Sequence, residues 1–188
     1  SGLQRALLHA RLSIRDPRPL ADQPMRNGDG SVWLCYNGEV YGWEDDKAFL
    51  QRSGHEFFST SDTEFILRAY EQWGWEGLLP RLRGMFAFAL WDGDAQRYLI
   101  ARDPLGVCPL YWGHDEAGRL CVASEMKALV GLCADVAAFP PGHVYDSADR
   151  SLRRFHHRPW RDYAAVRGAT VAPTELRAAF EAAVHRQL

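Results

Sequence analysis

The sequence lacks the features of several large classes of protein. It contains no apolar run near the ~18 residues that a membrane-spanning helix needs, and its first residues do not form the charged and apolar regions of a secretory signal. It also lacks the excess of basic residues that binds a phosphate backbone, because 22 Lys and Arg stand against 24 Asp and Glu. We therefore expect a soluble, cytoplasmic protein with neither a nucleic acid nor a membrane as partner.

Metal-binding patterns are missing as well. The four cysteines form no Cys-x-x-Cys pair, and none of the seven histidines lies in a His-Glu-x-x-His pattern. His156 and His157 are adjacent, so on a strand they would point to opposite faces and could not chelate one ion together. The sequence predicts no metal site, and reduced thiols in place of disulfides.

The composition is that of a folded domain of ordinary size. The 188 residues are 47% hydrophobic and 24% charged, which excludes an intrinsically disordered chain. Apolar and polar residues alternate from Ala6 to Ile14, which predicts a half-buried strand. Leu8 and Leu12 would lie on its buried face, and His9 and Arg11 on the other.

The later part of the chain predicts further strands and two longer helices. Residues 85–91 are almost wholly apolar, as in a strand that is buried on both faces. Ser61 and Glu64 have the spacing of a capping box, and apolar residues follow at helical spacing as far as Gly74. A last helix is expected over residues 174–188. The class is therefore α+β with mostly antiparallel strands.

Asn37-Gly38 is the first candidate for a functional site, and it has two interpretations. Between apolar runs, Asn-Gly is a strong indication of a hairpin turn. The same pair could present a side-chain amide and a backbone N–H, which are the donors that an oxyanion hole requires. The local sequence does not decide between them.

Other polar residues are equally open to a structural or a functional role. Arg11 and Arg15 could be solvated, or could grip a carboxylate with a guanidinium group. Asp62 suits the first turn of a helix, and both Asp62 and Glu39 could accept hydrogen bonds from an ammonium group. Cys35 could be a nucleophile, but nothing in the sequence activates it, and a buried strand cysteine is the simpler interpretation.

Together these segments resemble the glutamine amidotransferase domain of asparagine synthetases, a class II member of the N-terminal-nucleophile hydrolases. Each motif is short, but their order and spacing from Leu8 to Tyr145 are specific. The motifs are Arg11-Leu12-Ser13-Ile14, Gln23-Pro24, Tyr36-Asn37-Gly38-Glu39-Val40-Tyr41, Ser61-Asp62-Thr63-Glu64, Leu82-Arg83-Gly84-Met85-Phe86-Ala87-Phe88, Ala101-Arg102-Asp103-Pro104-Leu105-Gly106, Pro109-Leu110-Tyr111, Ala123-Ser124-Glu125-Met126-Lys127-Ala128-Leu129 and Phe139-Pro140-Pro141-Gly142.

The resemblance implies a four-layer αββα sandwich, and the hydrolysis of L-glutamine to supply ammonia for the ATP-dependent amidation of aspartate. It also implies a role for each candidate residue. Asn37 and Gly38 would form the oxyanion hole, and Glu39 and Asp62 would bind the α-amino group. The carboxylate of the substrate would be held by Arg11 and its neighbours in the segment Leu12, Ser13, Ile14 and Arg15.

The chain departs from the family pattern at its start. The family's nucleophile is an N-terminal Cys followed by Gly, whose own α-amine acts as the base. Here Ser1-Gly2 comes only nine residues before Arg11, too few for the family's first strand and helix. We expect Ser1-Gly2 to be a turn, and the nucleophile, first strand and first helix to lie outside this sequence.

The other departure concerns the synthetase half. No Ser-Gly-Gly-x-Asp-Ser loop for pyrophosphate occurs, so ATP and Mg²⁺ would belong to a synthetase domain in cis that this sequence does not include. We expect residues 1–150 to form the amidotransferase domain, and residues 151–188 to be a linker and a helix. A homodimer is possible in principle.

Two hypotheses of different classes follow. The chain is the glutaminase part of an asparagine synthetase-type enzyme and is inactive alone, or it is a nucleophile-less scaffold or glutamine-binding module. The presence of all the substrate-binding residues favours the first, because a scaffold has no physical need for them.

Overall fold

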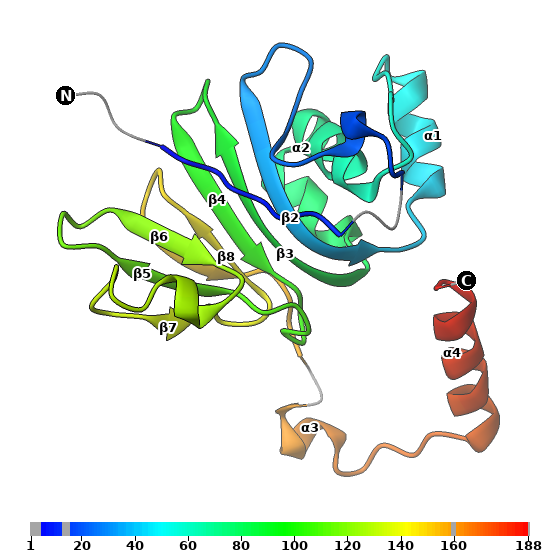
Figure 1. The fold of residues 1–188 in the computed structure, drawn as a ribbon. Coiled ribbons are helices and arrows are strands. Elements are labelled where there is room, and N and C mark those ends of the chain that lie inside the picture. The colour runs from blue at the N-terminus through cyan, green and yellow to red at the C-terminus, as the bar shows by residue number, and fades with distance from the viewer. Residues whose placement is uncertain (1–4, 13–15, 159–160, 188) are drawn as a thin grey trace. The chain divides into compact units, whose positions relative to one another are not determined.

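The computed structural model describes residues 5–12, 16–158 and 161–187 (Figure 1). The chain divides into two units, Ser1–Phe155 and His156–Leu188, and each is described by itself. The first unit contains β1 (Met25–Arg26), β2 (Val32–Val40), α1 (Glu44–Arg52), α2 (Asp62–Leu78), β3 (Gly84–Asp92), β4 (Arg97–Arg102), β5 (Tyr111–His114), β6 (Leu120–Ala123), β7 (Ala137–Ala138), β8 (His143–Asp146), β9 (Ser151–Arg154), and the short 3-10 turns η1 (Pro19–Ala21), η2 (Leu79–Arg81) and η3 (Met126–Ala128).

The strands form two sheets. The larger has six strands in the order β1-β2-β3-β4-β8-β9, and the smaller has three in the order β6-β5-β7. Every pairing between these strands is antiparallel. The large sheet extends to β9, beyond residue 150, where the sequence placed the start of a linker.

Two hydrophobic cores lie on opposite faces of the large sheet. On β3, Phe86, Phe88 and Leu90 belong to the core shared with α1 and α2. Ala87 belongs to a second core, which includes Leu110 and Phe139 beside the small sheet. This alternation along one strand confirms that β3 is buried on both faces.

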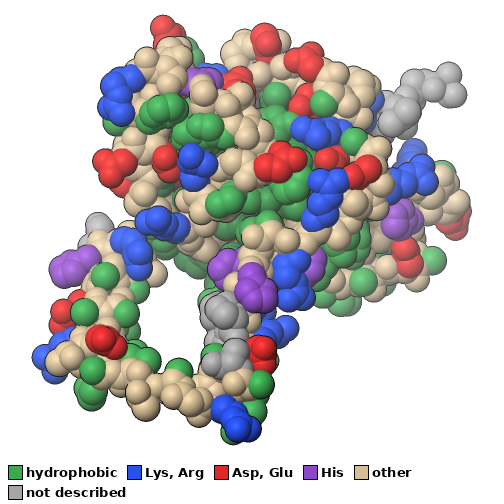
Figure 2. All heavy atoms as spheres, turned by 180° about the vertical axis from the view of Figure 1, so that it is seen from behind, with side chains coloured by type: hydrophobic (Ala, Val, Ile, Leu, Met, Phe, Trp, Pro, Cys, Tyr) green, Lys and Arg blue, Asp and Glu red, His purple; other side chains and the backbone are tan. Residues whose placement is uncertain are grey.

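The layers are therefore helices, large sheet and small sheet (Figure 1). This is the α+β sandwich that the sequence predicts, with three of its four layers among the described residues of the first unit. Acidic, basic and hydrophobic side chains are interspersed on the surface seen in Figure 2, in keeping with the near balance of charges.

Helix α2 begins where the sequence predicts, but only one of the two interactions of a capping box forms. The Ser61 hydroxyl accepts a hydrogen bond from the Thr63 N–H over 3.1 Å. The Glu64 carboxylate accepts from the N–H groups of Phe58 and Ser59, so it orders the preceding loop instead of closing a capping box. Non-helical dihedral angles at Gly74 (φ 63°) interrupt the helix where the sequence places its end.

The predicted strand over residues 6–14 is wrong for the residues that are described. Residues 5–12 form no strand, and cross the large sheet instead of extending its edge (Figure 1). The expected faces are also reversed, because Leu8 and Leu12 are 89% and 81% exposed while His9 is half-buried. Exposed and half-buried residues still alternate, but His9 is on the half-buried side, where its ring nitrogen hydrogen-bonds to the Tyr36 carbonyl oxygen.

The second unit contains α3 (Tyr163–Val166) and α4 (Pro173–His185). Helix α4 corresponds to the helix expected over residues 174–188, and its apolar Leu176 and Phe180 are exposed. Among the described residues, no helix has the length and apolar character required to cross a membrane.

Candidate functional site

Asn37 and Gly38 lie in the middle of strand β2. They pair with Ala87 and Phe86 of β3, and the pairing continues without a break from Val32 to Val40. The hairpin interpretation of Asn-Gly is therefore excluded. Asn37 and Gly38 are both exposed, whereas Tyr36 and Val40 on either side are buried.

Gly38 is required by the close approach of β2 and β3. Its φ of 146° is one that residues with a side chain rarely adopt, and a Cβ there would lie 2.1 Å from the Met85 carbonyl oxygen. Gly84 makes the reciprocal approach, since its Cβ would lie 2.1 Å from the Glu39 carbonyl oxygen. The absence of a side chain at both glycines allows β2 and β3 to approach closely at the candidate site.

The edge of β2 that faces away from β3 presents backbone donors. The Tyr36 N–H donates to Gln23 Oε1 over 2.6 Å, and the Val40 N–H donates to Asp62 Oδ2 over 3.0 Å. Because N–H groups alternate between the two edges of a strand, the Gly38 N–H points to this same edge. Here β1 pairs only with Trp33 and Leu34, so no described strand covers Gly38.

Asp62 connects the first turn of α2 to β2 at residues that lie on both sides of Gly38. Its Oδ2 accepts from the Tyr36 hydroxyl over 2.7 Å and from the Val40 N–H. Burial, followed by the charge of Asp62, raises the pKa of the Tyr36 hydroxyl far above its usual range, so Tyr36 remains a donor. Asp62 thus contacts β2 before and after Gly38, and the half-buried Glu39 is the residue that follows Gly38.

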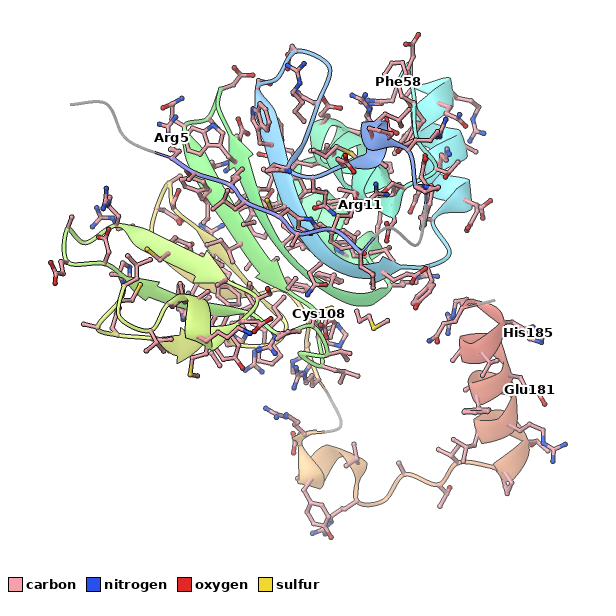
Figure 3. The ribbon with its side chains drawn as sticks, in the orientation of Figure 1. Arg5, Arg11, Phe58, Cys108, Glu181 and His185 are labelled. Carbon is pink, nitrogen blue, oxygen red and sulfur yellow. The ribbon has the colours of Figure 1, made fainter. Side chains whose placement is uncertain are left out.

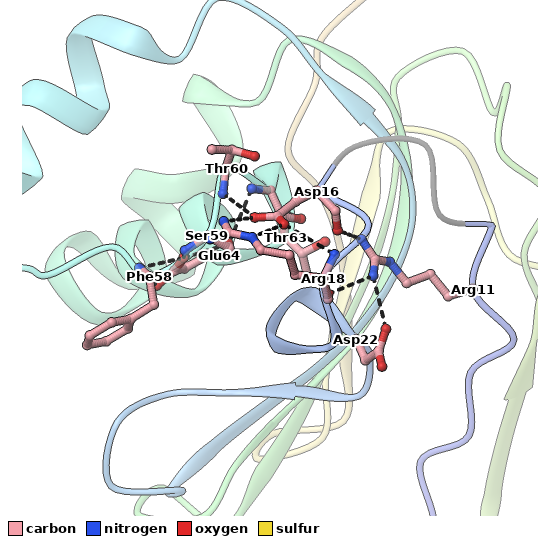
Figure 4. Close-up of polar contacts among 10 residues, drawn as sticks. Arg11, Asp16, Arg18, Asp22, Phe58, Ser59, Thr60, Thr63 and Glu64 are labelled. Carbon is pink, nitrogen blue, oxygen red and sulfur yellow. Dashed lines mark hydrogen bonds and ion pairs between the residues drawn. The ribbon is translucent and has the colours of Figure 1, made fainter.

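Arg11 lies where the N-terminal segment crosses the sheet (Figure 3). Its guanidinium donates to the Asp22 carboxylate over 2.9 Å and to the carbonyl oxygens of Asp16 and Arg18 (Figure 4). The side chain is 13% exposed, so it is fixed in position and largely desolvated.

Asp16 connects Arg11, which donates to its carbonyl oxygen, to the start of α2 (Figure 4). The Asp16 carboxylate is bound by the Arg18 guanidinium at 2.6 and 2.5 Å and by the Thr60 N–H at 2.8 Å. These contacts, Arg18 first, hold the pKa of the Asp16 carboxyl well below its usual range. Gln23 makes a second connection, because its amide joins the Tyr36 N–H to the Thr63 hydroxyl.

The residues predicted to bind the carboxylate beside Arg11 are Leu12, Ser13, Ile14 and Arg15. Leu12 is 81% exposed. Ser13, Ile14 and Arg15 lie outside the described residues.

The thiols near the site are not activated. Burial raises the pKa of Cys35 to about 11. The pKa of Cys108 is also raised to about 11, by burial and then by Asp103. Neither side chain is a thiolate at neutral pH, which supports the structural interpretation of Cys35.

The Arg102-Asp103 motif organises the loop that follows β4. Asp103 is buried, and its carboxylate accepts from the N–H groups of Leu105, Gly106, Val107 and Cys108 at 2.6–3.0 Å and from that of Phe86 at 3.4 Å. Arg102 donates to three carbonyl oxygens of the same region. Because Phe86 also pairs with Gly38, it connects this loop to the candidate site.

Sequence reasoning missed three supporting residues: Asp16, Gln23 and Tyr36. The sequence indicates no role for Asp16, and it indicates Gln23 and Tyr36 only as members of the family motifs. Their contacts join residues that are 13 to 44 positions apart, so no local pattern indicates them. The order of the motifs along the chain was the only indication.

The fold and site define an amidotransferase-type α+β sandwich. A family model described as "Glutamine amidotransferase domain" matches residues 2–146, and the chain belongs to this family.

Its relatives are longer proteins. Over 182 residues the chain is 44% identical to asparagine synthetase B [glutamine-hydrolyzing] of Escherichia coli and 42% identical to asparagine synthetase [glutamine-hydrolyzing] 2 of rice (Oryza sativa). These alignments cover 97% of the chain but only 32% and 30% of the relatives. The chain thus spans about a third of the length of these relatives.

Solved structures agree on the fold. Glutamine phosphoribosylpyrophosphate amidotransferase from B. subtilis, complexed with ADP and GMP, aligns with a TM-score of 0.60 and 26% identity. The alignment covers 72% of this chain and 32% of that one. The fold is therefore that of the N-terminal-nucleophile amidotransferases.

Proposed function

We propose that this chain is the glutamine-binding part of a glutamine-hydrolysing asparagine synthetase. Arg11 binds the α-carboxylate of L-glutamine, and Glu39 and Asp62 bind its α-ammonium group. The Asn37 amide and the Gly38 N–H stabilise the oxyanion that forms when the side-chain amide is attacked.

The orientation of the Gly38 N–H is the observation that carries this proposal. It lies on the open edge of β2, between two N–H groups that already have side-chain acceptors. A fixed backbone donor beside an exposed amide costs no reorganisation when negative charge develops on the substrate. The scaffold alternative gives no reason for such a donor. The relatives described above are named as glutamine-hydrolysing enzymes and do not favour it.

The released ammonia would be used by the part that the relatives have beyond the matched segment. We expect that part to hold ATP and Mg²⁺ and to amidate aspartate. Among the described residues, no group of three or more His, Cys, Asp or Glu side chains could hold a metal ion. By the resemblance to the family, the attacking thiolate would be that of an N-terminal cysteine. Cys35 and Cys108 are unsuited to this role, because burial raises the pKa of each thiol to about 11.

Calorimetric titration of the chain with L-glutamine tests the binding half of the proposal. We expect L-glutamine to bind more tightly than D-glutamine or L-glutamate. Asp62→Asn should weaken binding at least tenfold, about the effect of losing one charge-assisted hydrogen bond. Asp94→Asn replaces an exposed acid of the β3–β4 hairpin and is the matched control.

Equal affinity for the three ligands, or equal affinity of the Asp62→Asn and Asp94→Asn variants, would contradict the proposed site. Circular dichroism of each variant separates a binding defect from a folding defect.

A further inference from the structure

Two half-buried thiols, Cys121 and Cys133, meet in the small sheet, away from the candidate glutamine site. Cys121 is on β6 and pairs with Gly113 of β5. Cys133 lies before β7 and forms a bridge with Asp115, two residues beyond Gly113. Both cysteines are free thiols.

Gly113 makes the contact between the two thiols possible. A Cβ at Gly113 would lie 3.0 Å from the Cys133 Cβ, so Cys133 occupies the space that a side chain would fill. Directly paired residues of antiparallel strands place their side chains on the same face, with Cβ atoms ~5 Å apart. Cys121 and Cys133 therefore lie on one face of β5, close enough for the Cys121 thiol to contribute to a raised pKa of Cys133.

We propose that Cys121 and Cys133 are a reversible disulfide site, oxidised by a peroxide or by exchange with a low-molecular-weight disulfide. With peroxide, one thiolate attacks an oxygen, the O–O bond breaks, and a sulfenic acid and water are formed. The second sulfur then displaces the hydroxyl group as water and forms the S–S bond. Two electrons and two protons pass from the thiols to one peroxide, which gives two waters. With a low-molecular-weight disulfide, one thiolate breaks its S–S bond, forming a mixed disulfide and releasing one small thiol. The second sulfur then displaces the other small thiol, so that two small thiols are formed for each protein disulfide.

The bond would close a loop over residues 122–132. This segment contains η3 and the exposed side chains of Met126, Val130 and Leu132. A crosslink at the two ends restricts the unfolded chain and should stabilise the small sheet. Cys35 and Cys108 belong to other parts of the unit, on β2 and in the loop after β4, so they do not compete for either sulfur.

The rate should depend on pH. Burial, and then the Cys121 thiol with the charges of Asp135 and Asp115, raises the pKa of Cys133 to about 11. Asp135 is in turn paired with His114 at 2.8 Å. Because the thiolate is the attacking species, disulfide formation should accelerate as pH rises towards that value.

Mass spectrometry of the purified chain tests the proposal. After hydrogen peroxide or oxidised glutathione, the monomer should lose two hydrogens, about 2 Da. Titratable thiols should fall from the four of the sequence to two. Peptide mapping should find Cys121 linked to Cys133, and dithiothreitol should restore four thiols and the original melting temperature.

Two variants make the test specific. Cys35→Ser with Cys108→Ser keeps the pair and should give the same crosslink and a raised melting temperature. Cys133→Ser removes it and should give neither. Persistence of free Cys121 and Cys133 in oxidised wild-type protein, or a crosslink that joins other cysteines, would overturn the proposal even if the double variant does not fold. The readout is independent of glutamine binding.

Discussion

At the scale of single residues, Asp103 has the clearest structural role. Its buried carboxylate accepts from five backbone N–H groups of the loop and of β3. Asp103→Ala would leave these donors without an acceptor in a buried place. We expect the free energy of unfolding to fall by about 3 kcal/mol or more, because hydrogen bonds to a charged group contribute ~1.5–3 kcal/mol each. Urea unfolding measures this directly.

Asp94→Ala is the matched control, since Asp94 is exposed on a turn. It should change the free energy of unfolding by no more than about 0.5 kcal/mol. If both variants lose the same stability, the role assigned to Asp103 is wrong.

At the scale of elements, Asp16 fastens the N-terminal segment to the start of α2. A carboxyl whose folded pKa is lowered stabilises the fold above its unfolded pKa, near 3.9. That contribution is lost as the pH falls from there through the folded pKa. Asp16→Asn should therefore lower the melting temperature at about pH 7, and the difference from wild type should shrink below about pH 4.

Thermal unfolding followed by circular dichroism at both pH values checks this, with Asp94→Asn as the control. A difference that stays constant, or grows, on acidification would contradict the link through Asp16 and Thr60.

The sequence predicted elements wherever one local pattern decides. The apolar run 85–91 is β3, and Ser61 caps α2. The strand prediction failed for residues 6–12, because alternation indicates two faces but not which neighbour covers each. The choice at Asn37-Gly38 could not be made locally either, since β3 pairs with β2 from about 50 residues away.

At the scale of the whole molecule, both hydrophobic cores lie within the first unit. The large sheet separates them, and its last strand is β9. Phe155 follows β9, donates its N–H to the Gly142 carbonyl, and stacks on Phe86 with ring centroids 6.3 Å apart. The packing of the first unit therefore continues through β9 to Phe155 and does not end at residue 150.

Two truncations test this boundary. The chain that ends at Phe155 keeps β9 and the Phe86 contact, so it should melt cooperatively within a few degrees of the 188-residue chain. The chain that ends at Arg150 loses β9, which uncovers the edge of β8 and removes Phe155 from the core. It should melt several degrees lower and tend to associate, because an uncovered strand edge pairs with other chains. Calorimetry and light scattering report both effects. Equal melting temperatures would mean that the unit folds by residue 150, and an unfolded chain ending at Phe155 would mean that it depends on residues 156–188.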